Sequence, residues 1–175
     1  MQIICHRINT LELLSQLKSS DGAEVDVRYH LDDLILHHDP FQHYANNPLH
    51  LESFLKSWYC KGPLILNLKS EGIEAKCIDL MTKYNISNWF FLDMSMPFFV
   101  NHSIQSELKS IEGFGPENLA VRFSDFEPID YAIAFKHRVN WAWVDTFRDF
   151  PLSVEKYTEL KEAGFKICLV SPELQ

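Results

Sequence analysis

Short apolar runs alternate with helix-like segments along almost the whole chain. Strands are expected around Glu24 and Asp26 and at residues 3–6, 34–36, 64–69, 89–92, 119–123, 141–144 and 165–170. Helices are expected between most of them, beginning with one that Asn9 and Thr10 can cap. Strands that alternate with helices pair in parallel, so their carboxyl ends meet at one edge of the sheet.

Polar side chains gather at or near the ends of these expected strands. They are His6, Glu24, Asp26, Asn67, Lys69, Asp93, Arg122 and Asp145. Such ends form the active sites of (β/α)8 barrels and of open doubly wound sheets. An open sheet would usually carry a glycine-rich phosphate loop after its first strand, and residues 6–9 here read His-Arg-Ile-Asn. The sequence therefore predicts a TIM (β/α)8-like barrel, incomplete with seven strands because the chain ends soon after residue 170; the segment 34–36, a hairpin return, is not counted among the seven.

Length and composition set the broad class of the protein. A chain of 175 residues with 46% hydrophobic residues predicts a single domain over residues 1–175. The net charge of −8 argues against nucleic acid as a partner. The four cysteines form no C-x-x-C pair and match no zinc site. With no expected signal peptide and no apolar run of about 20 residues, a cytoplasmic protein without a transmembrane segment is expected.

The segment 22–40 reads as strand, turn, strand and contains an unusual pair of carboxylates. Glu24 and Asp26 are two residues apart in a strand and therefore share one of its faces. If both were buried they would repel each other, and at least one would have to be neutral. A hard divalent cation, which prefers oxygen ligands, would remove that conflict. The alternative is a polar hairpin with histidines at the surface.

Histidines follow two of the expected strands. His6 and Arg7 come after the first, and His37 and His38 come after the return strand of the hairpin. Imidazoles beside an arginine and a carboxylate pair favour acid–base chemistry on an anionic ester. His37 and His38 face opposite sides of a strand, so the choice of His38 depends on the register.

Taken together, these motifs resemble the glycerophosphodiester phosphodiesterase family, which shares a barrel with the phosphatidylinositol-specific phospholipases C. The family pattern is His-Arg-Gly, an Asn-Thr helix start, Glu-x-Asp, His-Asp after the hairpin, and Glu-x-Lys. This chain has H-R, then N-T, E-V-D-V, L-I-L-H-H-D-P and L-N-L-K. The match is close over residues 3–40 and partial to residue 70.

The resemblance implies Mg²⁺- or Ca²⁺-assisted hydrolysis of a phosphodiester, such as a glycerophosphodiester or a related polyol phosphodiester. By position, the family's catalytic acid–base pair corresponds to His6 and His38, its phosphate ligands to Arg7 and Lys69, and two of its metal ligands to Glu24 and Asp26. Cationic groups suit this reaction because the phosphodiester gains negative charge in the transition state. Arg122 is a further candidate for substrate binding, and the alternative for it is an ordinary ion pair.

Two residues depart from the family pattern. Ile8 stands where the family has glycine, so the loop after the first strand is expected to be less open. Asn67 stands where the family has its third acidic metal ligand. An amide oxygen still coordinates hard cations, so Asn67 is kept as a metal ligand of reduced charge. Weaker metal binding is expected, or help from one of three further carboxylates, Glu71, Asp93 and Asp145.

Three further readings stay open at this point. The chain can be a catalytically degenerate anion-binding module of the same fold. It can also be a lyase of the phospholipase C type, which gives a cyclic phosphate. Finally, a seven-stranded barrel would have an open edge, through which a homodimer is plausible.

Overall fold

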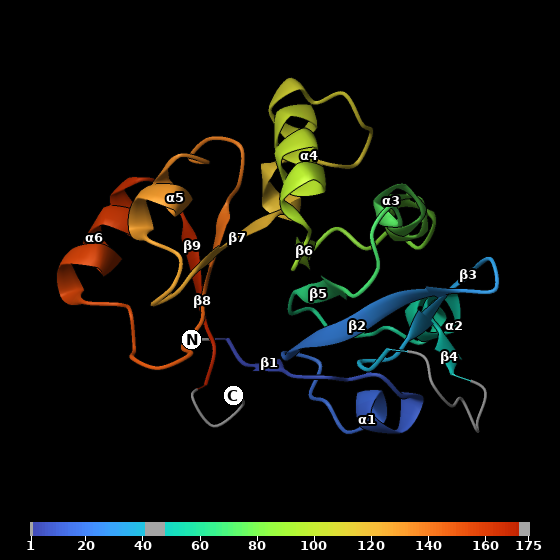
Figure 1. Ribbon diagram of the computed structural model, residues 1–175. Helices are drawn as coiled ribbons and strands as arrows, with labels where there is room; N and C mark the ends of the chain where they lie inside the picture. Colours follow the sequence, from blue (N-terminus) through green and yellow to red (C-terminus); the bar gives the residue numbers. More distant parts are fainter. Residues whose placement is uncertain (1, 41–47, 172–175) are drawn as a thin grey trace. The chain divides into compact units, whose positions relative to one another are not determined.

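The computed structural model describes residues 2–40 and 48–171, which belong to two compact units (Figure 1). Unit 1 is Met1–Phe98 and unit 2 is Phe99–Gln175. Within the described ranges, no helix has the length and apolar character needed to cross a membrane. The single domain over residues 1–175 stays a prediction.

Unit 1 contains a mixed sheet of six strands, coloured blue to green in Figure 1. Its strands are β1 (Ile4–Cys5), β2 (Gly22–His30), β3 (Asp33–Leu36), β4 (Leu49–His50), β5 (Leu64–Leu68) and β6 (Trp89–Leu92). The order is β4-β3-β2-β5-β6, and β1 pairs separately with β2. One edge of β2 is shared, because its first residues pair in parallel with β1 and its last ones antiparallel with β3. The other edge pairs in parallel with β5.

Both ends of β2 depend on special backbone conformations. A Cβ atom at Gly22 would lie 2.5 Å from the Pro63 carbonyl oxygen, so only glycine fits at the start of the strand. At its end, Leu31 and Asp32 have φ angles of 45° and 67°, which makes a two-residue turn with both residues left-handed. The hairpin therefore closes without the glycine that such turns favour.

Three helices of unit 1 are described: α1 (Leu11–Ser15), α2 (Leu51–Lys56) and α3 (Glu74–Lys83). The Thr10 side chain accepts a hydrogen bond from the Leu13 amide, so the predicted cap at the start of α1 is confirmed. Every residue of β5 and β6 is buried, Asn67 included. A buried amide in an otherwise apolar strand needs polar partners, and those partners belong to the candidate site.

Unit 2 contains a parallel sheet of three strands, β7 (Ala120–Phe123), β8 (Trp141–Val144) and β9 (Lys166–Leu169), in the order β7-β8-β9. Its helical segments are α5 (Ile129–Ile133), α6 (Val154–Glu162), the 3-10 helix η1 (Pro116–Asn118) and most of α4 (Met96–Leu108), which begins in unit 1. Phe123, Leu160 and Phe165 are completely or almost completely buried. These apolar side chains give unit 2 a core of its own.

The prediction of a TIM (β/α)8-like barrel, incomplete with seven strands, is wrong. The described strands form two separate sheets, one mixed and one parallel, and β3 and β4 add antiparallel pairs that such a barrel does not contain. Alternating strands and helices predict parallel pairing between neighbours. They do not predict closure, which also requires matched tilt and stagger around the whole ring.

The four cysteines are all free thiols. Cys60, Cys77 and Cys168 are buried, and Cys5 is half-buried. Burial raises the pKa of Cys77 far above its usual range and the pKa of Cys168 to about 12. Both of these thiols are therefore protonated and unreactive while the protein is folded.

Candidate functional site

The candidate site lies in unit 1, where several strands of the six-stranded sheet end. His6 and Arg7 follow β1, and Lys69 follows β5 directly. Asp26 in β2 lies opposite Asn67 in β5, because these two residues are partners in the parallel register. The strand ends thus bring together residues that are far apart in the sequence.

Glu24 is the centre of the site and is only 1% exposed. Its Oε2 accepts a hydrogen bond of 2.7 Å from the Arg7 amide and lies 3.5 Å from His6 Nε2. Its Oε1 accepts a hydrogen bond of 2.8 Å from Asn67 Nδ2. Burial, and then the neighbouring Asp26 carboxylate, raise the pKa of Glu24 above its ordinary value.

Asp26 is completely buried and is held by Asn9 at two points. Asn9 Nδ2 donates to Asp26 Oδ2 at 2.8 Å, and Asn9 Oδ1 accepts from the Asp26 amide at 2.9 Å. Asp26 Oδ1 has no hydrogen bond to a described residue but lies 3.6 Å from Lys69 Nζ. Asn9 therefore fixes the carboxylate so that one oxygen is turned towards the ammonium group.

The donor chemistry of this cluster fits a hard cation. In this cluster, the buried oxygens Asp26 Oδ1 and Asn67 Oδ1 accept no hydrogen bond from a described residue. Buried oxygens without a partner are uncommon, and a bound ion is one way to satisfy them. No group of three or more His, Cys, Asp or Glu side chains among the described residues surrounds a common metal position. A cation here would therefore need the amide oxygen of Asn67, and the predicted Mg²⁺ or Ca²⁺ stays a prediction.

His38 is held in one tautomer by its two neighbours. Arg7 Nη2 lies 2.9 Å from His38 Nε2, and since a guanidinium can only donate, Nε2 accepts. The proton is then on Nδ1, which lies 2.9 Å from Asp39 Oδ1. This hydrogen bond lowers the pKa of Asp39. The basic nitrogen of His38 therefore faces the Arg7 guanidinium.

His6 is partly buried and lies close to two cationic side chains, Arg7 and Lys69. Burial is the main cause that lowers its pKa below 6.5, and the positive charges of Arg7 and Lys69 add to it. Asp26 acts in the opposite direction, with an effect smaller than those of burial and of Arg7. His6 is thus neutral at pH 7 and able to accept a proton.

Asp93 adds a third acidic side chain beside these residues. It follows β6 directly, and its Oδ2 lies 3.6 Å from Lys69 Nζ. Arg7 and Asp93 both have left-handed backbones, with φ angles of 55° and 61°. Among the described residues, the other left-handed non-glycine positions lie in turns or just after a helix, at Leu31, Asp32, Asn85, Lys109 and His137. Left-handed residues at two strand ends of one cluster are typical of functional sites.

Arg28 connects two strand ends at the site. Its guanidinium donates to the His38 carbonyl at 2.7 Å and 3.3 Å and to the Lys69 carbonyl at 3.0 Å. Arg28 is in β2, four residues after Glu24, and therefore shares its strand face. The sequence indicated Asn9 as part of a helix start but not its bonds to Asp26, and it assigned no role to Arg28, because these contacts depend on the register of β2 against β3 and β5.

Arg122, a predicted substrate ligand, lies in unit 2. Its Nε is 3.8 Å from Asp145 Oδ2, and its guanidinium carbon is 5.7 Å from the centre of the Phe147 ring. The pair belongs to adjacent strands of the three-stranded sheet, since Asp145 follows β8. The role of Arg122 in substrate binding stays a prediction.

The chain matches no model of a known protein family, and no curated protein sequence matches it either. The resemblance to the glycerophosphodiester phosphodiesterases stays a prediction that depends on the motif residues. Seven predicted site residues lie in unit 1 and form a continuous set of contacts or close electrostatic interactions. They are His6, Arg7, Glu24, Asp26, His38, Asn67 and Lys69.

Proposed function

We propose that unit 1 carries a phosphodiesterase site that hydrolyses a glycerophosphodiester or a related polyol phosphodiester with the help of a metal ion. The observation that supports this is the cluster of two imidazoles, two cationic side chains and two buried carboxylates, in which His6 contacts Glu24 and Arg7 contacts His38. The proposal depends on this cluster and not on the fold, because no barrel is formed.

The cationic side chains would bind the phosphate. Arg7 and Lys69 each supply a positive charge to an anion that becomes more negative in the transition state. Arg7 would turn from His38 Nε2 to the phosphate oxygens and leave this nitrogen available. Lys69, positioned between the carboxylates of Asp26 and Asp93, would stay in place as the second contact.

The two imidazoles would have different tasks. His6, with its lowered pKa, would remove the proton from the attacking oxygen, which is a water or a hydroxyl of the substrate. Once Arg7 has turned to the phosphate, His38 Nε2 would take up a proton from solvent, and it would give this proton to the leaving alkoxide as the new P–O bond forms and the old one breaks. His38 Nδ1 donates a hydrogen bond to Asp39 Oδ1, and this bond would remain when Nε2 is also protonated.

Glu24, Asp26 and Asn67 would hold the divalent cation through their oxygens. When bound, the ion would stabilise the negative charge that builds up on the phosphate. Asn9 would keep the Asp26 carboxylate oriented, because it is bonded to both the side chain and the backbone of Asp26. Such support of a ligand typically affects metal affinity by about 10- to 100-fold.

A substrate screen tests the proposal. Glycerophosphodiesters and polyol phosphodiesters are incubated with the protein in Mg²⁺, Ca²⁺ or EDTA, and the products are followed by phosphorus NMR. Turnover is expected in a divalent metal and is expected to be lost in His6→Ala and in His38→Ala, while the far-UV circular dichroism spectrum is unchanged. His137→Ala, a turn residue of unit 2, is the matched control. Full turnover in both site variants would contradict the assignment of the acid–base pair.

A degenerate anion-binding module is the second candidate. Asn67 supports it, because its amide group already donates to Glu24 and brings no negative charge. Binding of a phosphodiester without turnover under any metal condition would favour this candidate. A cyclic phosphate as the final product would instead favour the lyase. The homodimer stays a prediction. The open barrel edge through which it was expected to form does not exist, because the described strands form two separate sheets.

A further inference from the structure

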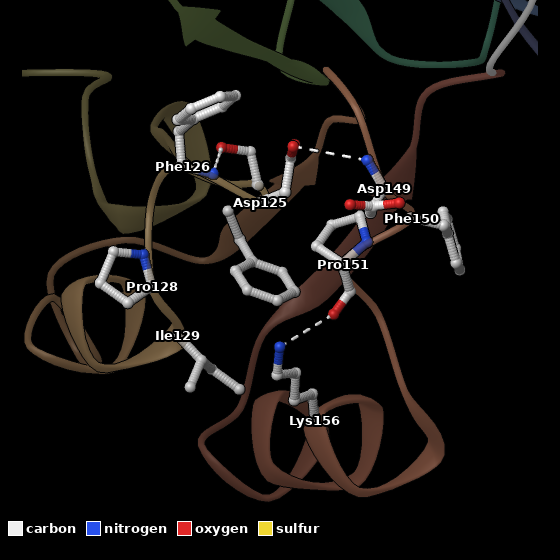
Figure 2. Close-up of a pocket in the computed structure, with 10 residues that line it drawn as sticks. Asp125, Phe126, Pro128, Ile129, Asp149, Phe150, Pro151 and Lys156 are labelled. Atoms are coloured by element: carbon white, nitrogen blue, oxygen red, sulfur yellow. Dashed lines mark hydrogen bonds between the residues drawn. The ribbon is translucent and has the colours of Figure 1, made fainter.

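A cavity of about 450 Å³ lies within unit 2 (Figure 2). It is formed by the segment after β7, the start of α5, the segment after β8 and one side chain of α6. The lining residues are Phe123, Ser124, Asp125, Phe126, Pro128, Ile129, Asp149, Phe150, Pro151 and Lys156. Its volume is within the range of small-molecule sites, roughly 300–1,000 Å³. It shares no residue with the cluster of unit 1.

The walls of this cavity are mainly rings. Phe123 is buried, whereas Phe126 and Phe150 are 60% and 55% exposed. The rings of Pro128 and Pro151 add flat apolar surface (Figure 2). Exposed phenylalanines around a hollow are costly to leave in water, and ring faces and edges favour a flat apolar ligand.

Lys156 adds one positive charge to the cavity. Its Nζ donates a hydrogen bond of 3.1 Å to the Pro151 carbonyl (Figure 2). The same Nζ lies 5.4 Å from the centre of the Phe123 ring. Over residues 2–40 and 48–171 it makes no ion pair with a carboxylate. A half-buried ammonium group on an aromatic wall therefore has the capacity to bind an anion.

The two acidic residues of the lining do not neutralise the positive charge of Lys156. The Asp125 carboxylate accepts hydrogen bonds from the backbone amides of Phe147, Arg148 and Asp149, at 2.9, 3.0 and 3.4 Å. These amides lower the pKa of Asp125, although burial acts against them as the largest single cause. Asp149 is exposed, so water screens its charge from a ligand inside the cavity.

We propose that this cavity binds a small aromatic carboxylate, with its ring between the phenylalanine and proline walls and its carboxylate on the Lys156 ammonium group. The ring accounts for the apolar walls, and the carboxylate supplies the anionic partner that the ammonium group does not have among the described residues. The proposal is independent of the phosphodiesterase proposal, because it uses no residue of unit 1.

Binding of two isosteric probes tests this. Naphthalene-2-carboxylate and the uncharged naphthalene-2-carboxamide are titrated into the full chain, and the methyl signals of Ile129 are followed by NMR. The carboxylate is expected to shift these signals and to bind about tenfold more tightly than the amide, because a charge-assisted hydrogen bond is at stake. Equal affinities, or shifts that leave Ile129 unaffected, would overturn the proposal.

Two variants separate charge from shape. Lys156→Met keeps the length of the side chain and is expected to remove the preference for the carboxylate while the amide binds as before. Asp149→Asn removes a nearby negative charge and is expected to tighten carboxylate binding by about twofold. A melting temperature within about 2 °C of the wild type shows that each variant is folded. An unchanged preference in folded Lys156→Met would refute the role of the ammonium group.

Discussion

Glu24 carries its charge in surroundings that disfavour it. The carboxylate is buried beside Asp26, and its pKa is raised although Arg7 and Asn67 donate hydrogen bonds to it. A residue that reduces stability but remains at the centre of a polar cluster is typical of a functional site. Its removal should therefore have opposite effects on stability and on cation binding.

Glu24→Gln is expected to stabilise the metal-free protein at pH 7 by on the order of 1 kcal/mol, because it removes a buried charge. The folded pKa is raised, so the destabilising charge is present above that pKa and disappears as Glu24 is protonated. The extra stability of Glu24→Gln over the wild type should thus shrink as the pH falls through the raised pKa of Glu24, and it should be absent well below the ordinary value of 4.5. Urea denaturation in EDTA at several pH values measures it.

The exposed Glu71→Gln is the matched control and should leave stability unchanged at each pH. Calorimetric titration of Mg²⁺ or Ca²⁺ completes the test, since Glu24→Gln should weaken any binding seen in the wild type. A loss of stability in Glu24→Gln at pH 7 would show that its hydrogen bonds outweigh the cost of its burial.

His6 should titrate below pH 6.5. Its lowered pKa means that the imidazole stays neutral, and able to act as a base, at mildly acidic pH. We expect the NMR signals of the His6 ring to change with a midpoint below 6.5 and the acidic limb of kcat/KM to follow the same midpoint. His6→Ala assigns the signals. A midpoint at or above 6.5 would show that the nearby carboxylates outweigh burial and the cations.

At the level of single residues, motifs and strand ends predicted several side chains that the structure brings together in the candidate site. The spacing of Glu24 and Asp26 on one strand, and the positions of His6 and His38 after strands, were enough to name four of its groups. Asn9 acts on Asp26 across 17 positions of sequence, and Arg28 acts on Lys69 across 41. Contacts of that kind follow from strand register, which a single sequence does not provide.

Among the elements, the ends of β3 and β5 are held together by one guanidinium. Arg28, near the end of β2, donates to the carbonyls of His38 and Lys69. We assign Arg28 a positioning role, because it contacts the backbone of two candidate site residues and not their reactive atoms. A small displacement of either residue would affect activity strongly.

Arg28→Lys keeps the charge but loses the planar fork, and it is expected to lower kcat/KM by about 10- to 100-fold. Both KM and kcat should change, because Arg28 holds the backbone of Lys69, a proposed phosphate ligand, and that of His38, the proposed acid. Added ethylguanidinium should partly restore the kcat/KM of Arg28→Ala. Arg138→Lys, whose exposed guanidinium pairs with Glu107 in unit 2, should behave as the wild type. An unchanged kcat/KM in Arg28→Lys would contradict the positioning role.

Most elements were predictable because their apolar runs are long enough for a buried strand. The observed β6, β7 and β8 agree with the expected strands to within one residue. Helices were less well bounded: between the strands expected at 119–123 and 141–144, α5 covers only Ile129–Ile133 and a turn follows it. Helix ends are set by capping contacts and packing, which local periodicity does not specify.

For the whole molecule, the sequence predicted a parallel α/β arrangement but not its division into two sheets. The pairing of β5 with β6, or of β7 with β8, follows from the order of elements along the chain. Whether β6 continues into the next strand depends on the twist and tilt of the sheet as a whole. No local pattern contains that information, so the barrel was a reasonable but incorrect extrapolation.

The positions of two buried thiols allow the cooperativity of unfolding between the two units to be measured without any added label. Cys77 belongs to unit 1 and Cys168 to unit 2. Two triple cysteine-to-serine variants, each keeping one of these thiols, would report by their rate of reaction with a disulfide reagent how often each half of the chain opens. We expect different urea dependences for the two rates, and identical ones would show that both halves unfold in a single step.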